Sequence, residues 1–232
     1  MTVADDCGGR PMTVAPNAFQ SASDVISLAM LLCVMAMLRA PFVRSQVRLY
    51  RFQSIAVTAL VVVVAATHGL DGLYLLAGVS FLTKVVLVPA IMGRLAPGLD
   101  ADLSSSASMR TASMLLIAAA ASAFGFFAIG ALRLPVRTLP SPALSIAIAS
   151  LLISILLAIL RSDVATQGIA FFSVENAVSV ASLVVATALP VVMEIAFLFD
   201  LLVAVVAFGL LMRVHHQRGG TLSTKPITKL RG

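Results

Sequence analysis

Long apolar runs separated by short polar segments repeat along the chain. A helix rises about 1.5 Å per residue, so it needs roughly 20 apolar residues to cross the roughly 30 Å hydrocarbon core of a bilayer. Seven runs are close to that length, at residues 19–38, 52–69, 73–92, 112–132, 143–160, 169–188 and 190–212. The pattern therefore predicts an all-α integral membrane protein with about seven transmembrane helices.

Two pairs of runs are separated by only a few residues, at 68–72 and at 188–190. Connections this short bring consecutive helices back beside each other, so we expect an antiparallel hairpin at each place. The predicted organisation is a flexible N-terminal tail at 1–18, a four-helix membrane segment at 19–132, a three-helix segment at 143–212 and a basic tail at 213–232.

Composition supports a membrane protein and argues against an enzyme acting alone. Hydrophobic residues make up 60% of the chain and charged residues only 11%, whereas soluble domains average about 25% charged residues. Two cysteines provide neither a disulfide framework nor a cysteine metal site. The sequence has no glycine-rich phosphate loop, nucleophile elbow or Cys/His cluster, so we expect no cofactor, no metal and no catalytic residue.

Basic residues gather in alternate connections between the runs. One side of the membrane has twelve Lys and Arg residues: Arg39, Arg44, Arg48, Arg51, Arg94, Arg110, Arg161, Arg213, Arg218, Lys225, Lys229 and Arg231. The other side has three. Basic loops stay in the cytoplasm, so we expect a multi-pass protein of the bacterial inner membrane with its N-terminus outside. The net charge of +6 then indicates contact with membrane lipids and not with nucleic acid.

The first three runs resemble the last three. An offset of 122 residues carries Gln53 onto Glu175, and an offset of 116 carries Lys84 onto Asp200. With one helix between the two copies, both would have the same orientation in the membrane. We therefore consider two parallel three-helix repeats joined by one helix as a hypothesis.

Four ionisable residues lie within the apolar runs: Lys84, Glu175, Glu194 and Asp200. A charge at the centre of a bilayer costs about 2.5–3.5 kcal/mol on insertion scales. Such residues are therefore usually paired or in contact with water, and they often mark the routes of protons or ions. We take these four as candidates for proton transfer or charge coupling.

Lys84 lies near the centre of the third run, shortly before Pro89. Proline has no amide hydrogen, so the carbonyl of Val85 loses its helical partner. A kinked and locally polar spot is expected beside the lysine. Two roles remain open for Lys84: a permanent structural ion pair, or a lysine that passes protons on.

The three carboxylates also allow two interpretations each. Glu175 and Glu194 either handle protons or are buried structural carboxylates, protonated or paired. Asp200 either handles protons or neutralises Lys84 across the helix bundle. Glu194 and Asp200 lie about 120° apart around one helix at 100° per residue, so we expect them to face different neighbours.

Residues 73–95 read LYLLAGVSFLTKVVLVPAIMGRL, and further motifs are FFSVENA at 171–177, Leu-Pro before Glu194, and LFDLLV at 198–203. The first segment resembles the E component of hydrogenase-4 and formate hydrogenlyase type complexes, which carries a similar F-x-T-K-V-x-x-V-P-x-I-M run. The C-terminal motifs look like the same family's patterns. The resemblance extends over about residues 20–213.

Through that family, residues 143–212 are also similar to the three-helix K subunit of respiratory complex I. That subunit has one membrane glutamate in each of its last two helices, and Glu175 and Glu194 occupy matching places. The chain departs from it in the extra N-terminal helices and in Asp200. The resemblance implies a cofactor-free subunit beside antiporter-like membrane subunits, under a peripheral nickel–iron hydrogenase or a related redox arm.

We therefore expect a membrane-arm subunit of a complex I-like redox complex that contributes to assembly and to proton or sodium translocation. Two alternatives remain open. The charged spans and the possible repeat are also compatible with a stand-alone secondary transporter. The chain could also be a purely structural spacer in such a complex. Co-purification separates these readings, because a transporter purifies alone or as a homo-oligomer and a subunit purifies with its partners.

Overall fold

The computed structural model describes residues 16–69, 71–95, 111–130, 141–161, 163–185 and 190–219. Their order is α1 (Pro16–Arg39), α2 (Val43–His68), α3 (Asp71–Phe81), the π-helix η1 (Leu82–Leu87), α4 (Val88–Leu95), α5 (Thr111–Gly130), α6 (Ser141–Leu160), α7 (Val164–Val185) and α8 (Pro190–Gly219). Because α3, η1 and α4 follow one another without a gap, they form one rod.

Six helices in the described part of the chain are long and apolar enough to cross a membrane, and Phe199–Leu211 is a shorter apolar stretch within α8. The expected all-α membrane protein with about seven helices is confirmed. It is a multi-pass membrane protein.

Several helices extend further than their apolar runs. α2 begins at Val43 instead of 52, and α7 begins at Val164 instead of 169. α8 continues to Gly219, so residues 213–219 of the predicted basic tail are helical. Hydropathy locates only the apolar part of a helix, and backbone hydrogen bonding carries the helix into polar sequence. The predicted N-terminal tail lies outside the described residues except at its end, as do residues 220–232.

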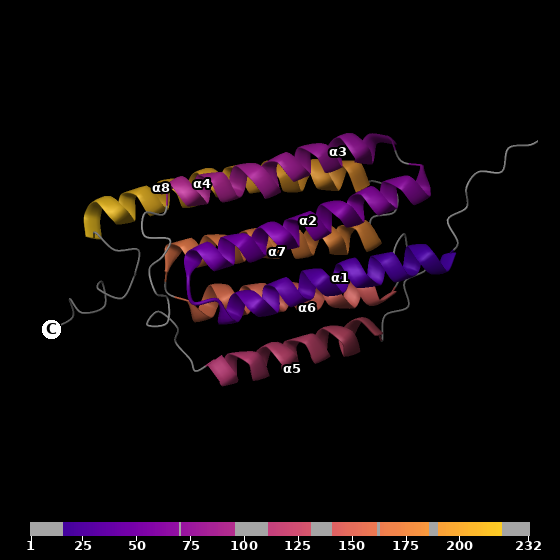
Figure 1. The fold of residues 1–232 in the computed structure, drawn as a ribbon, viewed down its shortest axis with the longest axis horizontal. Coiled ribbons are helices and arrows are strands. Elements are labelled where there is room, and N and C mark those ends of the chain that lie inside the picture. The colour runs from indigo at the N-terminus through magenta and orange to yellow at the C-terminus, as the bar shows by residue number, and fades with distance from the viewer. Residues whose placement is uncertain are drawn as a thin grey trace, which may run out of the picture.

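The helices form two facing rows with α5 added at one end (Figure 1). α1 packs against α6, α2 against α7, and the α3–η1–α4 rod against α8, while α5 packs mainly against α6. Each facing pair joins corresponding members of the first and last three spans. A duplicated three-helix unit would give this pairing, although the duplication itself remains a hypothesis.

The two expected hairpins differ in how much of them is described. Gly69 ends α2 with a left-handed φ of 64°, and its amide donates to the carbonyl of Ala65. Glycine adopts this conformation without the steric penalty of a side chain, so α3 begins at Asp71 and packs back on α2. α7 and α8 also pack together, but their connection at 186–189 lies outside the described residues.

α7 is the central helix, and α5 is peripheral. Within the described chain, 72% of the α7 span is buried against other helices but only 17% of the α5 span. α5 nevertheless approaches α6 closely, because a side-chain carbon at Gly125 would lie 3.0 Å from the backbone nitrogen of Ala149. Polar side chains on α7 are therefore shielded from lipid, whereas those on α5 would face it.

Candidate functional site

Side-chain hydrogen bonds join α2 to α7 at successive levels of the bundle. Both helices bring polar side chains with an exposed fraction of 0% to their contact. The bonds run from Thr166 Oγ1 to Gln46 Oε1 at 2.7 Å, from Ser173 Oγ to Gln53 Oε1 at 2.9 Å, and from Asn176 Nδ2 to Ser54 Oγ at 2.9 Å. We call these six residues the polar seam.

Helical periodicity explains why the bonded pairs of the seam follow one line along the two helices. Gln46 and Gln53 are seven residues apart, as are Thr166 and Ser173. Seven residues make nearly two helical turns, so each pair lies on one face of its helix. Bonded partners are 120 to 122 residues apart in the sequence. α2 and α7 therefore run parallel and in register along the seam.

A buried ion pair lies at the inner end of the polar seam. Lys84 Nζ is 2.7 Å from Glu175 Oε1, and the two side chains are 0% and 4% exposed. Lys84 Nζ also donates to Ser179 Oγ at 3.2 Å. Glu175 directly precedes Asn176 of the seam. The buried side chain of Tyr50 lies near the Glu175 carboxylate. The structure thus brings together two of the four predicted residues.

Lys84 lies in η1, where the helix is widened. The amide of Val88 donates to the carbonyl of Thr83, five residues earlier, instead of to a carbonyl four residues earlier. Pro89 follows and has no amide to continue the α-helical pattern. The sequence predicted an irregularity here, and it takes the form of a π-helix, a feature often found at functional sites.

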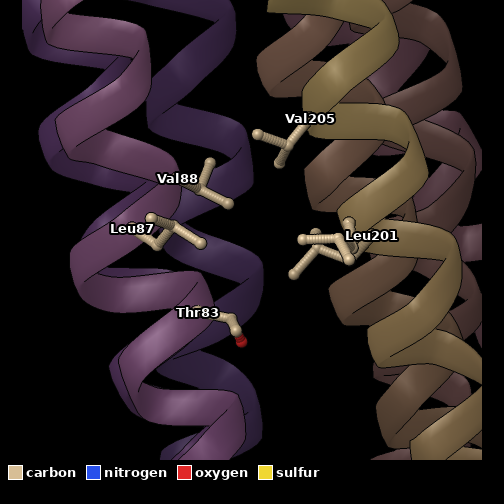
Figure 2. A pocket seen from close by; sticks show the side chains of 6 residues that line it. Thr83, Leu87, Val88, Leu201 and Val205 are labelled. Atoms are coloured by element: carbon tan, nitrogen blue, oxygen red, sulfur yellow. The ribbon is translucent and has the colours of Figure 1, made fainter.

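Asp200 is not part of the ion pair. It lies on the exposed side of α8, whereas its neighbour Leu201 is 1% exposed and faces the α3–η1–α4 rod. Figure 2 shows apolar side chains on both sides of this contact, together with the hydroxyl of Thr83. A pocket of about 10 Å³, barely enough for one water molecule, is lined there by Thr83, Leu87, Val88, Leu201, Leu202 and Val205. Glu175, and not Asp200, neutralises Lys84.

The fourth predicted residue is only partly placed. Glu194 lies near the start of α8, and its backbone is helical. Its side chain lies outside the described residues, so its role remains the prediction made from the sequence.

Two buried charged residues, Arg161 and Asp163, lie at the end of the seam away from Lys84, and the sequence did not indicate them as site residues. Arg161 Nη2 donates to the carbonyls of Leu38 at 3.2 Å and Ala40 at 3.3 Å, at the end of α1. Asp163 Oδ1 accepts from the amide of Thr166 at 2.7 Å and so caps α7. Burial lowers the pKa of Arg161, and the Asp163 carboxylate raises it. An aspartate three residues before a threonine at the start of an apolar run was the available signal.

α6 supplies a further link to the seam. The hydroxyls of Ser154 and Ser173 are 2.8 Å apart, so Ser173 connects α2, α6 and α7. Three buried seam atoms have no hydrogen-bond partner among the described residues: Gln46 Nε2, Gln53 Nε2 and Asn176 Oδ1. Buried polar atoms of this kind usually bind ordered water. The seam therefore has hydrogen-bonding capacity beyond what its own side chains use.

The polar seam reaches only halfway along the α2–α7 contact. Beyond Ser54 on α2, the buried side chains include Val57, Leu60, Val61 and Val64. Beyond Ser179 on α7, they include Val180, Leu183 and Val184. The buried polar pairs thus lie between the Lys84–Glu175 pair and one end of the bundle, the end at which the α1–α2 and α6–α7 connections lie (Figure 1).

The side chains of this site can form hydrogen bonds and hold opposite charges. Among the described residues, no group of three or more His, Cys, Asp and Glu side chains is placed to hold a metal ion. Lys84 and Glu175 form a buried pair of one basic and one acidic group. A buried pair of this kind responds to any change of charge nearby, because little water screens it.

The chain is similar to curated proteins of one name. It is 27% identical over 183 residues to proteins named hydrogenase-4 component E from two strains of Escherichia coli and from Shigella flexneri. The match covers 79% of this chain and 85% of each relative. No protein-family model and no solved structure matches it significantly. The resemblance predicted from the motifs around Lys84 and Glu175 is confirmed, and the chain is a homologue of hydrogenase-4 component E.

Proposed function

We propose that this chain is a membrane-arm subunit of a complex I-like, group 4 nickel–iron hydrogenase-type complex, and that its Lys84–Glu175 pair takes part in redox-driven proton translocation. Homology to hydrogenase-4 component E supports membership of a multi-subunit membrane complex. The observation that carries the proposed role is the ion pair itself, with both side chains almost fully buried.

Stability alone does not account for such a pair. Removing two charges from water costs several kcal/mol per ion, and replacing a buried pair by apolar residues is often neutral or stabilising. The buried side chains of α2 and α7 beyond Ser54 and Ser179 are mainly apolar, so polar groups are not needed for burial along these helices. A proton-handling role gives a reason to keep Lys84 and Glu175 in the bundle.

The pair can store a proton in two positions. With the proton on Lys84 the pair is ionic, and with the proton on Glu175 both groups are neutral. A charge that arrives from a neighbouring antiporter-like subunit would change the balance between these states. Redox chemistry in a peripheral arm would thereby be coupled to proton movement through this chain.

The polar seam supports a route between the pair and one side of the membrane. It begins beside Asp163 and Thr166 and ends at Asn176, next to Glu175. The basic connections at that end support a cytoplasmic location for it, because basic loops usually stay in the cytoplasm. The apolar half of the α2–α7 contact would block the opposite direction. Proton exchange of the pair is therefore one-sided within this chain.

Glu175→Gln in the intact complex tests the proposal. The amide keeps the shape of the glutamate but accepts no proton at neutral pH, so the complexes that assemble should pump at least about tenfold fewer protons. Proton uptake would be followed in proteoliposomes that contain the co-purified complex, with reduced methyl viologen as electron donor. Asp71→Asn, an acid-to-amide change on the exposed α2–α3 turn, is the matched control and should leave pumping unchanged.

Two results would contradict the proposal. Normal pumping in an assembled Glu175→Gln complex would make the chain a structural spacer. Purification of the native chain alone, or only with copies of itself, would favour a stand-alone transporter.

A further inference from the structure

We infer that the outer side of α8 around Asp200 docks a transmembrane helix of another subunit, and that this helix carries a lysine or arginine opposite Asp200. The inference rests on the proposed function, because it requires that the chain has membrane partners. It adds which surface they use and what chemistry recognises it.

Asp200 is exposed at the start of an apolar stretch of α8, Phe199–Leu211. Its neighbours Phe199 and Val203 are 68% and 51% exposed. In a bilayer this surface faces lipid unless another protein covers it. A carboxylate facing lipid at mid-membrane is costly, and such groups typically face a bundle interior or pair with an opposite charge.

The described part of the chain supplies no counter-charge to Asp200. The ion pair given to Lys84 is with Glu175, and the contact between α4 and α8 is filled by apolar side chains, including Val88 and Leu201. Among the described residues, Asp200 forms no ion pair. A lysine or arginine on a helix of another subunit would supply the opposite charge.

The residues around Asp200 have the spacing of a helix-packing surface. Spacings of three and four residues place side chains along one face, which is the pattern of helices that cross at a small angle. On α8 these spacings join Ala196, Asp200, Val203, Ala207 and Leu211, which we call the α8 stripe. All five side chains are exposed, and the two alanines allow close approach of a second backbone.

Charge complementarity decides between the possible occupants. A second copy of this chain, related by a two-fold axis through the α8 stripe, would place the two Asp200 carboxylates together. Like charges at the centre of an interface oppose association. A helix with a basic residue would neutralise Asp200 and cover the apolar side chains around it, which lipid alone does not achieve.

Crosslinking in the intact complex tests the docking surface. A benzoylphenylalanine photocrosslinker at Val203, in the middle of the α8 stripe, should form an adduct with a transmembrane segment of a co-purifying subunit. The crosslinked peptide, identified by mass spectrometry, should contain a lysine or arginine. The same probe at Ala204, next to Val203 but only 7% exposed, should give no adduct with another subunit.

Charge reversal provides the second arm. Asp200→Lys should lower the amount of co-purifying partner at least about tenfold, because it places two positive charges together. Changing the crosslinked basic residue of the partner to aspartate should restore the amount of co-purifying partner. Asp200→Asn should give an intermediate loss, and the amount of each variant in the membrane shows whether it has folded.

Each failure has a distinct meaning. Adducts with lipid alone, or normal co-purification of a folded Asp200→Lys variant, would overturn the docking surface and leave the proposed function intact. Adducts between two copies of this chain would identify a homo-oligomer and overturn both. The identity of the crosslinked molecule therefore shows whether the docking surface alone or also the proposed function is wrong.

Discussion

The contact between α2 and α7 has two halves of opposite character. In one half, the six side chains of the polar seam are buried and form hydrogen bonds across the interface. In the other half, the buried side chains of the same two helices are mainly apolar, such as Val61 and Val184. Both halves are buried, so polar side chains are not required for burial along these helices. The polar half is best explained by what it leads to, which is the Lys84–Glu175 pair.

Removing one partner of the Lys84–Glu175 pair should change the stability of the bundle more than replacing one side chain of the polar seam. Lys84→Met leaves Glu175 buried without its cation, which should lower the stability of the bundle by about 3–5 kcal/mol. The double variant Lys84→Met/Glu175→Leu should regain most of that stability, because no charge then remains, and should make the centre of the contact resemble its apolar half. Thermal unfolding of the purified complex gives the stabilities. If the double variant is no more stable than Lys84→Met, the ion pair itself stabilises the bundle, and stability alone would explain why the pair is present.

Removing one level of the polar seam should have a smaller effect on stability. Gln53→Leu makes that level resemble the apolar half, and Ser173 keeps its contact with Ser154, so stability should change by only about 1 kcal/mol. Proton pumping should nevertheless fall, because the connection to Glu175 is interrupted. Val61→Thr in the apolar half is the matched control, since it alters one buried side chain without changing its shape, and pumping should be unchanged. Equal pumping in the two variants would remove the functional distinction between the halves.

The sequence predicted the class of fold and the centre of the site. Apolar runs of membrane-spanning length gave the helices, and the isolated charges of Lys84 and Glu175 marked the site, because charge within an apolar run is costly. Which carboxylate Lys84 meets was not predictable, since it depends on which helices face each other and on the rotation of η1. Periodicity along single helices does not contain that information.

The polar seam was missed for a different reason. Single glutamine, serine and threonine residues are common in membrane helices, where they often bond their own backbone, as Thr58 does to the carbonyl of Ser54. Only the shared spacing of seven in α2 and α7 distinguished Gln46 and Gln53 from such residues. Asp163 was overlooked because it lies at a helix start, where a capping aspartate is ordinary.

The protonation of Glu175 during turnover is the most direct test of the account. A reduced-minus-oxidised infrared difference spectrum of the intact complex should contain a carboxyl C=O stretching band that disappears in Glu175→Gln and remains in Asp71→Asn. That result would show a proton arriving at or leaving the buried pair as electrons move. A spectrum identical in wild type and Glu175→Gln would contradict the account, because the pair would then keep its proton through the redox cycle.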